Sequence, residues 1–201
     1  ELLMIDIEKE LQRMTSEFQL DEKEVARNWR TVVRAAWSES CFKEQFYKLH
    51  AIRMQNDNPR SKKRFPIVVK YKCAICGELF SAVDTELDHK NGENQMLTLS
   101  DAENFTKVIL FPSPSELQIL CKDKKRKVNG KSIVGRFGCH GILTYSERYN
   151  VTLEQARAEK EAIQLVKLTK DKAWLVERGL KVPTTEVKRR ELIVSELLKN
   201  I

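Results

Sequence analysis

Cys73-Ala-Ile-Cys76-Gly77 is the stretch that decides how the middle of this chain can fold. Two thiolates three positions apart on a tight turn can both lie about 2.3 Å from one tetrahedral zinc ion, and Gly77 eases that turn. The alternative is a buried or redox-active cysteine pair. A zinc site needs a second pair of ligands, which the rest of the chain has to supply.

The second pair can come only from Cys121 and Cys139, because Cys41 stands alone in a predicted helix. These two cysteines complete the zinc site if residues 122–138 form an insertion whose ends lie close together. The alternative is that they are separate buried thiols. The five cysteines are an odd number and nothing in the sequence suggests secretion, so the sequence favours a metal over a disulfide framework.

A second candidate site lies in Glu86-Leu87-Asp88-His89-Lys90. Because neighbouring strand residues point to different sides, Asp88 can ligate a hard divalent cation while His89 stays free to take a proton. His140 directly follows Cys139, and a helix beginning near it would bring it toward Asp88. The alternatives are a surface histidine at position 89, a turn or cap role for Asp88, and a place for His140 at the zinc.

Four motifs, taken in order, resemble the HNH nucleases of the ββα-metal type, and most of all their four-cysteine branch of phage and mobile-element endonucleases. They are Cys73-x-x-Cys76, Asp88-His89, Leu117-Gln118-Ile119-Leu120-Cys121 and Cys139-His140. The resemblance covers about residues 70–150. It implies a two-stranded hairpin and a helix that grip one catalytic cation, a stapling zinc, and metal-dependent hydrolysis of DNA phosphodiesters.

Carried over by position, the resemblance implies that His89 is the general base and that Asp88 and His140 ligate the catalytic ion. The structural zinc would be held by Cys73, Cys76, Cys121 and Cys139. A sparse Asp/His site suits Mg²⁺, and an imidazole ligand also suits Mn²⁺, Ni²⁺ or Co²⁺. A neutral imidazole with its usual pKa of about 6.5 suits a base near neutral pH.

The chain differs from the family pattern in three places. Glu116 stands where the central Asn usually precedes the Leu-Gln-x-Leu-Cys string, and Asn104 could replace that Asn only if the segment after it folds back. Thr144 occupies the position, four residues after His140, at which the family often has His or Asn. The insertion at 122–138 separates Cys121 from Cys139, which lie close together in sequence in the family pattern.

The charge of the chain favours a polyanionic partner, since 36 Lys and Arg against 29 Asp and Glu give a net charge of +7. We expect this partner to be double-stranded DNA. Its phosphates would meet the insertion, where Asn129-Gly130 predicts a hairpin turn, and the basic segment 60–72. The expected contacts are Lys62, Lys63, Arg64, Lys124, Lys125, Arg126, Lys127 and Lys131. The alternative is a solvated hairpin whose lysines only keep the protein in solution.

The predicted fold class is α+β, a small zinc-stapled ββα-metal core flanked by N- and C-terminal α-helices. The expected parts are a helical region at 1–59, the nuclease core at 60–150 and a second helical region at 151–201. Helices are predicted over 2–14, from Asp21 onward, over about 40–55, and after Thr152 and Thr185. The apolar stripes of both helical ends could pack on the core or on a second subunit, which would make a homodimer.

No apolar run reaches the roughly 20 residues needed to cross a bilayer, so we expect no membrane-spanning segment. The first residue is Glu1, and we therefore expect a fragment or a processed form. The resemblance to phage and mobile-element endonucleases implies a cytoplasmic protein of bacterial or phage origin. Two other functional classes stay open. One is a non-catalytic, zinc-stabilised nucleic-acid-binding protein, and the other is a helix-mediated interaction protein with a purely structural zinc.

Overall fold

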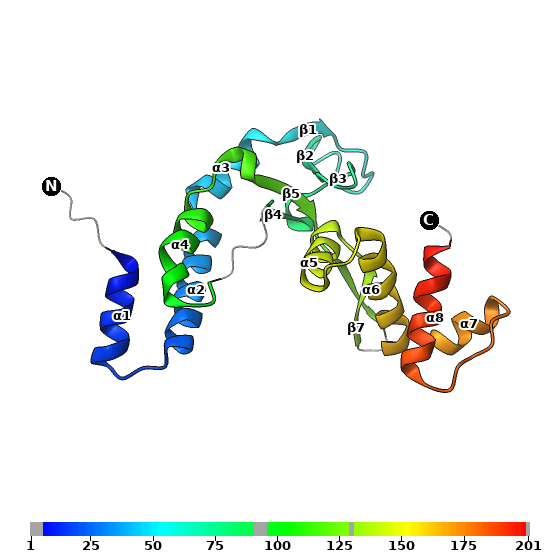
Figure 1. Ribbon diagram of the computed structural model, residues 1–201. Helices are drawn as coiled ribbons and strands as arrows, with labels where there is room; N and C mark the ends of the chain where they lie inside the picture. The colour runs from blue at the N-terminus through cyan, green and yellow to red at the C-terminus, as the bar shows by residue number, and fades with distance from the viewer. Residues whose placement is uncertain (1–5, 91–95, 129–130, 200–201) are drawn as a thin grey trace. The chain divides into compact units, whose positions relative to one another are not determined.

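The computed structural model describes residues 6–90, 96–128 and 131–199, and only the backbone at 126–128 and 131–133 (Figure 1). The helices are α1 (Ile7–Glu17), α2 (Glu22–Ser38), α3 (Cys41–Leu49), α4 (Ala102–Leu110), α5 (Cys139–Tyr149), α6 (Leu153–Lys167), α7 (Asp171–Glu177) and α8 (Glu186–Leu198). The strands are β1 (Ile52–Gln55), β2 (Ile67–Lys72), β3 (Leu79–Phe80), β4 (Thr85–His89), β5 (Leu117–Cys121), β6 (Lys124–Val128) and β7 (Lys131–Arg136). Three short 3-10 turns are η1 (Ala82–Asp84), η2 (Leu99–Asp101) and η3 (Pro114–Glu116). Small sheets among flanking helices confirm the α+β class.

The strands form three small sheets, with the orders β1-β2-β3, β4-β5 and β6-β7. The chain divides into two compact units. The first unit is Glu1–Ala74 with Leu87–Ile119, and the second is Ile75–Glu86 with Leu120–Ile201. The division falls inside both β4 and β5.

Helices α1, α2 and α4 of the first unit pack around one apolar cluster. The helices begin at capping aspartates, because Asp6 accepts a hydrogen bond from the Lys9 amide and Asp21 accepts one from the Lys23 amide. The cluster consists of Leu11, Ala26, Val33, Met96, Leu99, Ala102 and Phe105. The helix predicted from Asp21 is therefore confirmed, and the predicted segment 2–14 corresponds to α1 except at 2–5, which lie outside the described residues.

The helix predicted over about 40–55 is wrong in its second half. Helix α3 ends at Leu49, and Ile52–Gln55 form strand β1, which pairs antiparallel with β2. The register places Ile52 opposite Lys70 and Gln55 opposite Ile67. Pairing with a distant β-branched strand outweighs the helical spacing of apolar residues in this short stretch, because tertiary contacts override local propensity.

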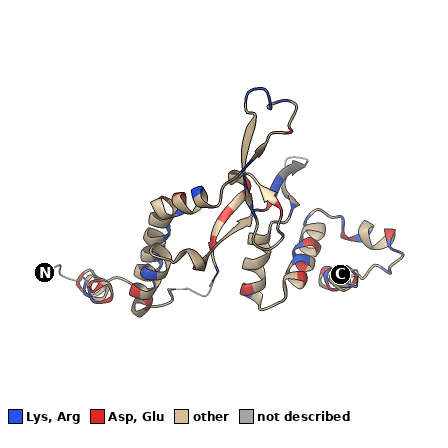
Figure 2. Ribbon diagram, turned by 90° about the horizontal axis from the view of Figure 1, so that it is seen from above, with Lys and Arg blue, Asp and Glu red and all other residues tan. Residues whose placement is uncertain are grey.

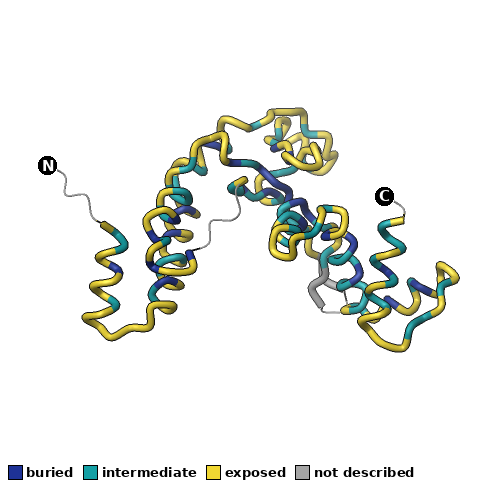
Figure 3. The backbone as a smooth tube through the Cα atoms, viewed as in Figure 1, coloured by how far each residue is buried: buried dark blue, intermediate teal, exposed yellow. Residues whose placement is uncertain are grey.

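Side chains of strands β4 and β5 pack in a second apolar cluster of the first unit. Leu87, Leu117 and Ile119 pack there with Trp37 and Phe46. The Lys90 amide donates to the Glu116 carbonyl at 2.8 Å, and buried positions run along β5 (Figure 3). This packing fixes the strand on which Asp88 and His89 lie.

The second unit contains hairpin β6–β7 and helices α5 to α8. Thr152 caps α6 with a capping box, and the Thr185 side chain accepts from the Lys188 amide at the start of α8, which confirms both predicted helix starts. Ala162, Leu175 and Ile193 form the buried centre of the helices. The hairpin pairs Val128 with Lys131, which agrees with a two-residue turn, although Asn129-Gly130 lies outside the described residues.

Candidate metal centre

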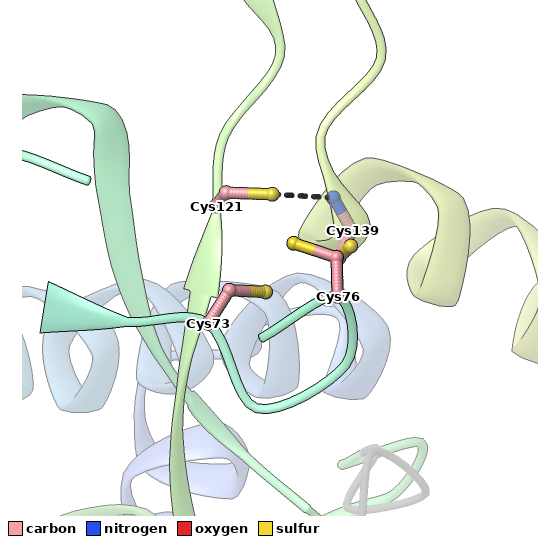
Figure 4. A group of neighbouring side chains, drawn as sticks. All are labelled: Cys73, Cys76, Cys121 and Cys139. Atoms are coloured by element: carbon pink, nitrogen blue, oxygen red, sulfur yellow. Dashed lines mark hydrogen bonds between the residues drawn. The ribbon is translucent and has the colours of Figure 1, made fainter. Parts of the chain in front are cut away.

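The structure brings together the four cysteines that the sequence singles out. The Sγ atoms of Cys73, Cys76, Cys121 and Cys139 all lie within 4.8 Å of one another (Figure 4). Four sulfurs at about 2.3 Å from a tetrahedral zinc would be about 3.8 Å apart, so the spacing suits this ion after small adjustments. Cys76 is exposed and the other three are buried, whereas Cys41 is exposed and stands apart from the cluster.

The first half of the site is a turn that follows strand β2. The Ala74 amide donates to the Ile119 carbonyl at 2.9 Å, which holds the chain immediately after Cys73. Gly77 has a φ of 72°, a left-handed conformation that costs least for glycine. The expectation that Gly77 eases the turn is confirmed, and the two thiols come within reach of one ion.

The second half of the site is closed by hairpin β6–β7. The hairpin pairs Lys124 with Arg136 and returns the chain to its starting point. A Cβ atom at Gly138 would lie 2.2 Å from the carbonyl carbon of Lys122, so only glycine allows this approach. The insertion therefore leaves Cys121 and Cys139 close together despite their separation in sequence.

The geometry at Cys139 favours thiolates. Its amide donates to Cys121 Sγ at 3.2 Å, as the dashed line in Figure 4 marks. Cys139 is also the first residue of α5, where the free amides and the helix dipole favour negative charge. Thiolates are the form of cysteine that binds zinc.

Two residues that the sequence analysis did not select hold this half of the site. Asp123 accepts a hydrogen bond from the Gly138 amide at 2.8 Å. Lys160 lies 3.6 Å from Asp123 Oδ2 and donates to the Gly141 carbonyl at 3.2 Å. Neither belongs to a motif, and the only hint in the sequence is that Asp123 is the single acid in a basic insertion.

His89, the candidate base, lies at the end of β4 among groups of the first unit. Its ring is 4.9 Å from the Trp37 ring between centroids and donates to the Ile109 carbonyl at the end of α4. Nε2 is buried without a hydrogen-bond partner among the described residues, so Nδ1 carries the proton. Burial lowers the pKa of His89, although the Ile109 carbonyl and the charges of Asp88 and Glu116 oppose this shift.

Asp88 and His140 are both half-buried, the first on β4 and the second in the first turn of α5. The predicted helix at His140 is confirmed. Within the described part of the chain, Asp88, His89 and His140 belong to no group of three or more metal-ligating side chains. Thr144 donates its hydroxyl proton to the His140 carbonyl at 2.9 Å, one turn earlier in the helix.

Glu116 organises the turn that leads into β5. Its carboxylate accepts from the Ser113 amide at 2.6 Å, and this hydrogen bond lowers the pKa of Glu116. Lys90 Nζ donates to the Ser115 carbonyl of the same turn at 2.6 Å. Asn104 lies exposed on α4. The resemblance implies an Asn just before β5. Of the two residues that could take its place, Glu116 forms a hydrogen bond in the loop before β5, whereas Asn104 lies on α4.

The basic residues lie on two hairpins. Lys62, Lys63 and Arg64 are exposed in the loop between β1 and β2 (Figure 2). Asn56 orders this loop by donating to the Phe65 carbonyl at 2.7 Å. Lys124 and Lys125 are exposed on β6, whereas the side chains of Arg126, Lys127 and Lys131 lie outside the description.

Comparison of the chain with protein-family models, with curated proteins and with solved structures finds no match. Among the described helices, none is both long and apolar enough to cross a membrane.

Proposed function

We propose that this protein is a metal-dependent DNA endonuclease of the HNH type. The observation that carries the proposal is the order of elements around the cysteine cluster. Strand β4 ends in Asp88-His89, the paired strand β5 ends in Cys121, and helix α5 begins with Cys139-His140. A strand, a second strand and a helix in this order are what the resemblance to ββα-metal nucleases implies.

Zinc would be held by Cys73, Cys76, Cys121 and Cys139, and its role would be structural. A site with four protein ligands leaves no open position for a substrate or a water. The ion would tie together the start of α5, the end of β5 and the turn after β2. It would thereby fix His140 and the base of the hairpin.

His89 would act as general base. The Ile109 carbonyl holds the proton on Nδ1, so Nε2 presents its lone pair. A buried ring nitrogen without a partner is costly, and a water molecule is a natural donor to it. The lowered pKa keeps the ring neutral at physiological pH, which is the state that can accept a proton.

Asp88 and His140 would hold the catalytic cation, for which Mg²⁺ or Mn²⁺ is the first choice and Ni²⁺ or Co²⁺ the second. Such an ion neutralises charge that develops on the phosphate and on the leaving oxygen. The lysines and arginines of both hairpins would bind backbone phosphates without reading bases.

The test is incubation of supercoiled plasmid with the protein, with and without Mg²⁺ or Mn²⁺. We expect nicked or linear DNA only with the cation, and we expect EDTA to stop the reaction. Wild-type protein that cleaves equally well with excess EDTA, or that never cleaves with any of the four cations, would contradict the proposal.

The buried position of His89 Nε2 favours a second candidate function, a zinc-stabilised protein that binds nucleic acid without cleaving it. In that case the ring would be part of the packing against Trp37. The same plasmid assay separates the two functions, because this candidate retards plasmid in a gel and leaves it supercoiled at every cation concentration.

A further inference from the structure

A pocket with a volume of about 450 Å³ lies within the first unit. It is bordered by α3, by the beginning of β1, by the end of β2 and by β5. The lining residues that matter here are Phe46, His50, Lys72, Lys90, Leu117 and Gln118. The volume falls in the range of about 300–1,000 Å³ that is typical of small-molecule sites.

The floor of the pocket is apolar and includes an aromatic platform. Phe46 and Leu117 are buried in the core of the unit. The His50 ring stacks on Phe46, with centroids 4.0 Å apart and an angle of 17° between the planes. His50 Nδ1 donates to the Phe46 carbonyl at 2.9 Å, which holds the ring flat and leaves Nε2 as an acceptor. A second flat ring can stack on such a platform.

The polar groups of the pocket have unused hydrogen-bonding capacity. The Lys72 ammonium and the Gln118 side-chain amide have no partner among the residues that the structure describes. Lys90 donates to the Ser115 carbonyl at 2.6 Å, but an ammonium has three protons to donate. Two cations, one amide and no acidic side chain line the described pocket. This combination suits a ligand that carries a negative group and a polar-edged ring.

We propose that this pocket binds one unpaired nucleotide of DNA. The base stacks on His50, its edge meets the Gln118 amide, and the phosphates on either side meet Lys72 and Lys90. The inference rests on the proposed function for its choice of DNA as the source of the nucleotide. It adds a preference for DNA with an extruded or unpaired base, since a base inside a regular duplex has no free face to stack.

Lys90 relates the pocket to Asp88, because the two residues are two positions apart at the end of β4 and alternate residues of a strand face the same side. Gln118 follows Leu117 on β5, the strand paired with the one that carries Asp88. A nucleotide held by Lys90 and Gln118 would anchor the strand next to the phosphate that is cut. The pocket would therefore help to select the phosphodiester bond that is cleaved.

The experiment compares two short fluorescent duplexes, one fully paired and one with a single unpaired adenine, in buffer without added divalent cation so that no cleavage occurs. We expect the wild-type protein to bind the duplex with the unpaired base about tenfold more tightly, as stacking of one base commonly contributes. 2-Aminopurine at the unpaired position should lose fluorescence on binding, because stacking quenches it.

Gln118→Ala and Lys72→Ser should each reduce the preference for the unpaired base by about threefold or more. The matched control is Lys70→Ser, which removes the same charge two residues earlier on β2 from a position that does not line the pocket. This control should weaken binding of both duplexes alike and leave their ratio unchanged.

Equal affinity for the two duplexes would overturn the inference and leave DNA binding intact. A failure to bind either duplex would overturn both this inference and the proposed function. A ratio reduced as much by Lys70→Ser as by Lys72→Ser would also overturn it, because strand charge and not the pocket would explain the effect. Binding of free deoxyadenosine monophosphate without any preference between the duplexes would count against DNA as the ligand.

Discussion

His89 is the residue through which the proposed chemistry can be tested most directly. We expect His89→Ala to lower the rate of plasmid cleavage by about 10²–10⁴, the usual loss when a general base is removed. Zinc content and DNA binding should stay close to wild type, and thermal unfolding should shift only modestly, because the half-buried ring packs on Trp37 and bonds the Ile109 carbonyl but does not belong to the four-cysteine group of the candidate zinc site. Undiminished cleavage by the purified variant would refute the assignment of the base.

The environment of His89 also predicts the pH dependence of cleavage. Burial lowers the pKa of His89 below its usual value of about 6.5. A base works when it is deprotonated, so the rate should rise with pH only up to this lowered pKa and be level above it. We expect single-turnover rates to be level from about pH 7.5 to 8.5, a unit or more above the usual pKa, and to fall as the pH drops through the lowered pKa. A rate that still rises tenfold per pH unit above neutrality would require another base.

Gly138 is the residue that permits the split zinc half-site. In Gly138→Ala the new methyl group would meet backbone atoms of Cys121 and Lys122 at 2.2–2.4 Å, and backbone cannot rotate away as a side chain can. We expect Cys121 and Cys139 to move apart, so that a colorimetric chelator removes zinc from the variant at least about tenfold faster than from wild type. Gly135→Ala, at an exposed position of β7, is the control and should keep its zinc.

At the scale of elements, hairpin β6–β7 is the part of the chain in which a role in DNA binding can be tested separately from the candidate zinc site. Its base is held by the hydrogen bond between Asp123 and the Gly138 amide, and β7 is held by Gln164, whose side chain exchanges two hydrogen bonds with the Val134 backbone. Its sequence contains Lys124, Lys125, Arg126, Lys127 and Lys131. Charges of either sign would keep a surface hairpin in solution. An unbroken run of positive charges is the pattern that binds phosphates.

We expect the joint change of Lys124, Lys125, Arg126 and Lys127 to Ser to weaken DNA binding. The log–log slope of affinity against salt should become shallower by about two to four units, since each lost phosphate contact removes nearly one. Zinc content and folding should persist. The control changes four exposed lysines of the same unit, Lys170, Lys172, Lys181 and Lys188, to Ser. If both variants show the wild-type salt slope, the hairpin does not touch DNA.

The other elements show which local signals are strong. Capping side chains at Asp21 and Thr152 predict helix starts because they satisfy free amides within the same turn. The segment 50–55 was mispredicted because its apolar spacing fits a helix, while its partner strand β2 lies more than ten residues later. Local chemistry marks where an element begins more reliably than how far it runs.

At the scale of the whole molecule, the four cysteines should bind one zinc per chain. Structural zinc can contribute on the order of 10 kcal/mol to folding of a small module. We therefore expect Cys73→Ser to lose the ion and to expose residues 70–150 to hydrogen exchange, even at saturating Mg²⁺. Cys41→Ser, which changes the exposed cysteine outside the cluster, should be nearly silent.

Elemental analysis of protein that has met no chelator provides the measurement. About one zinc per chain in wild type and in Cys41→Ser, and far less in Cys73→Ser, is the expected result. Active protein without zinc would rule out a zinc requirement at this centre, and the four cysteines, of which Cys76 is exposed and the other three are buried, would then be free thiols.

The sequence by itself indicated Cys73 and Cys76 as one half of the candidate metal centre, and it indicated the α+β class. Cys73 and Cys76 are three positions apart on one turn, and this spacing suffices to place two thiolates on one ion. Similarly, helix starts follow from caps whose hydrogen bonds stay within a few residues. Such features depend on short stretches of chain, so a sequence pattern can predict them.

Only the tertiary structure decided how Cys121 meets Cys139 and what surrounds His89. The first depends on the contact of Gly138 with the carbonyl of Lys122 across the base of a hairpin. The second depends on Trp37 of α2 and on the Ile109 carbonyl of α4, both far from His89 in sequence. Burial and its effect on a pKa arise from groups that folding brings together, and a local pattern contains no information about which groups those are.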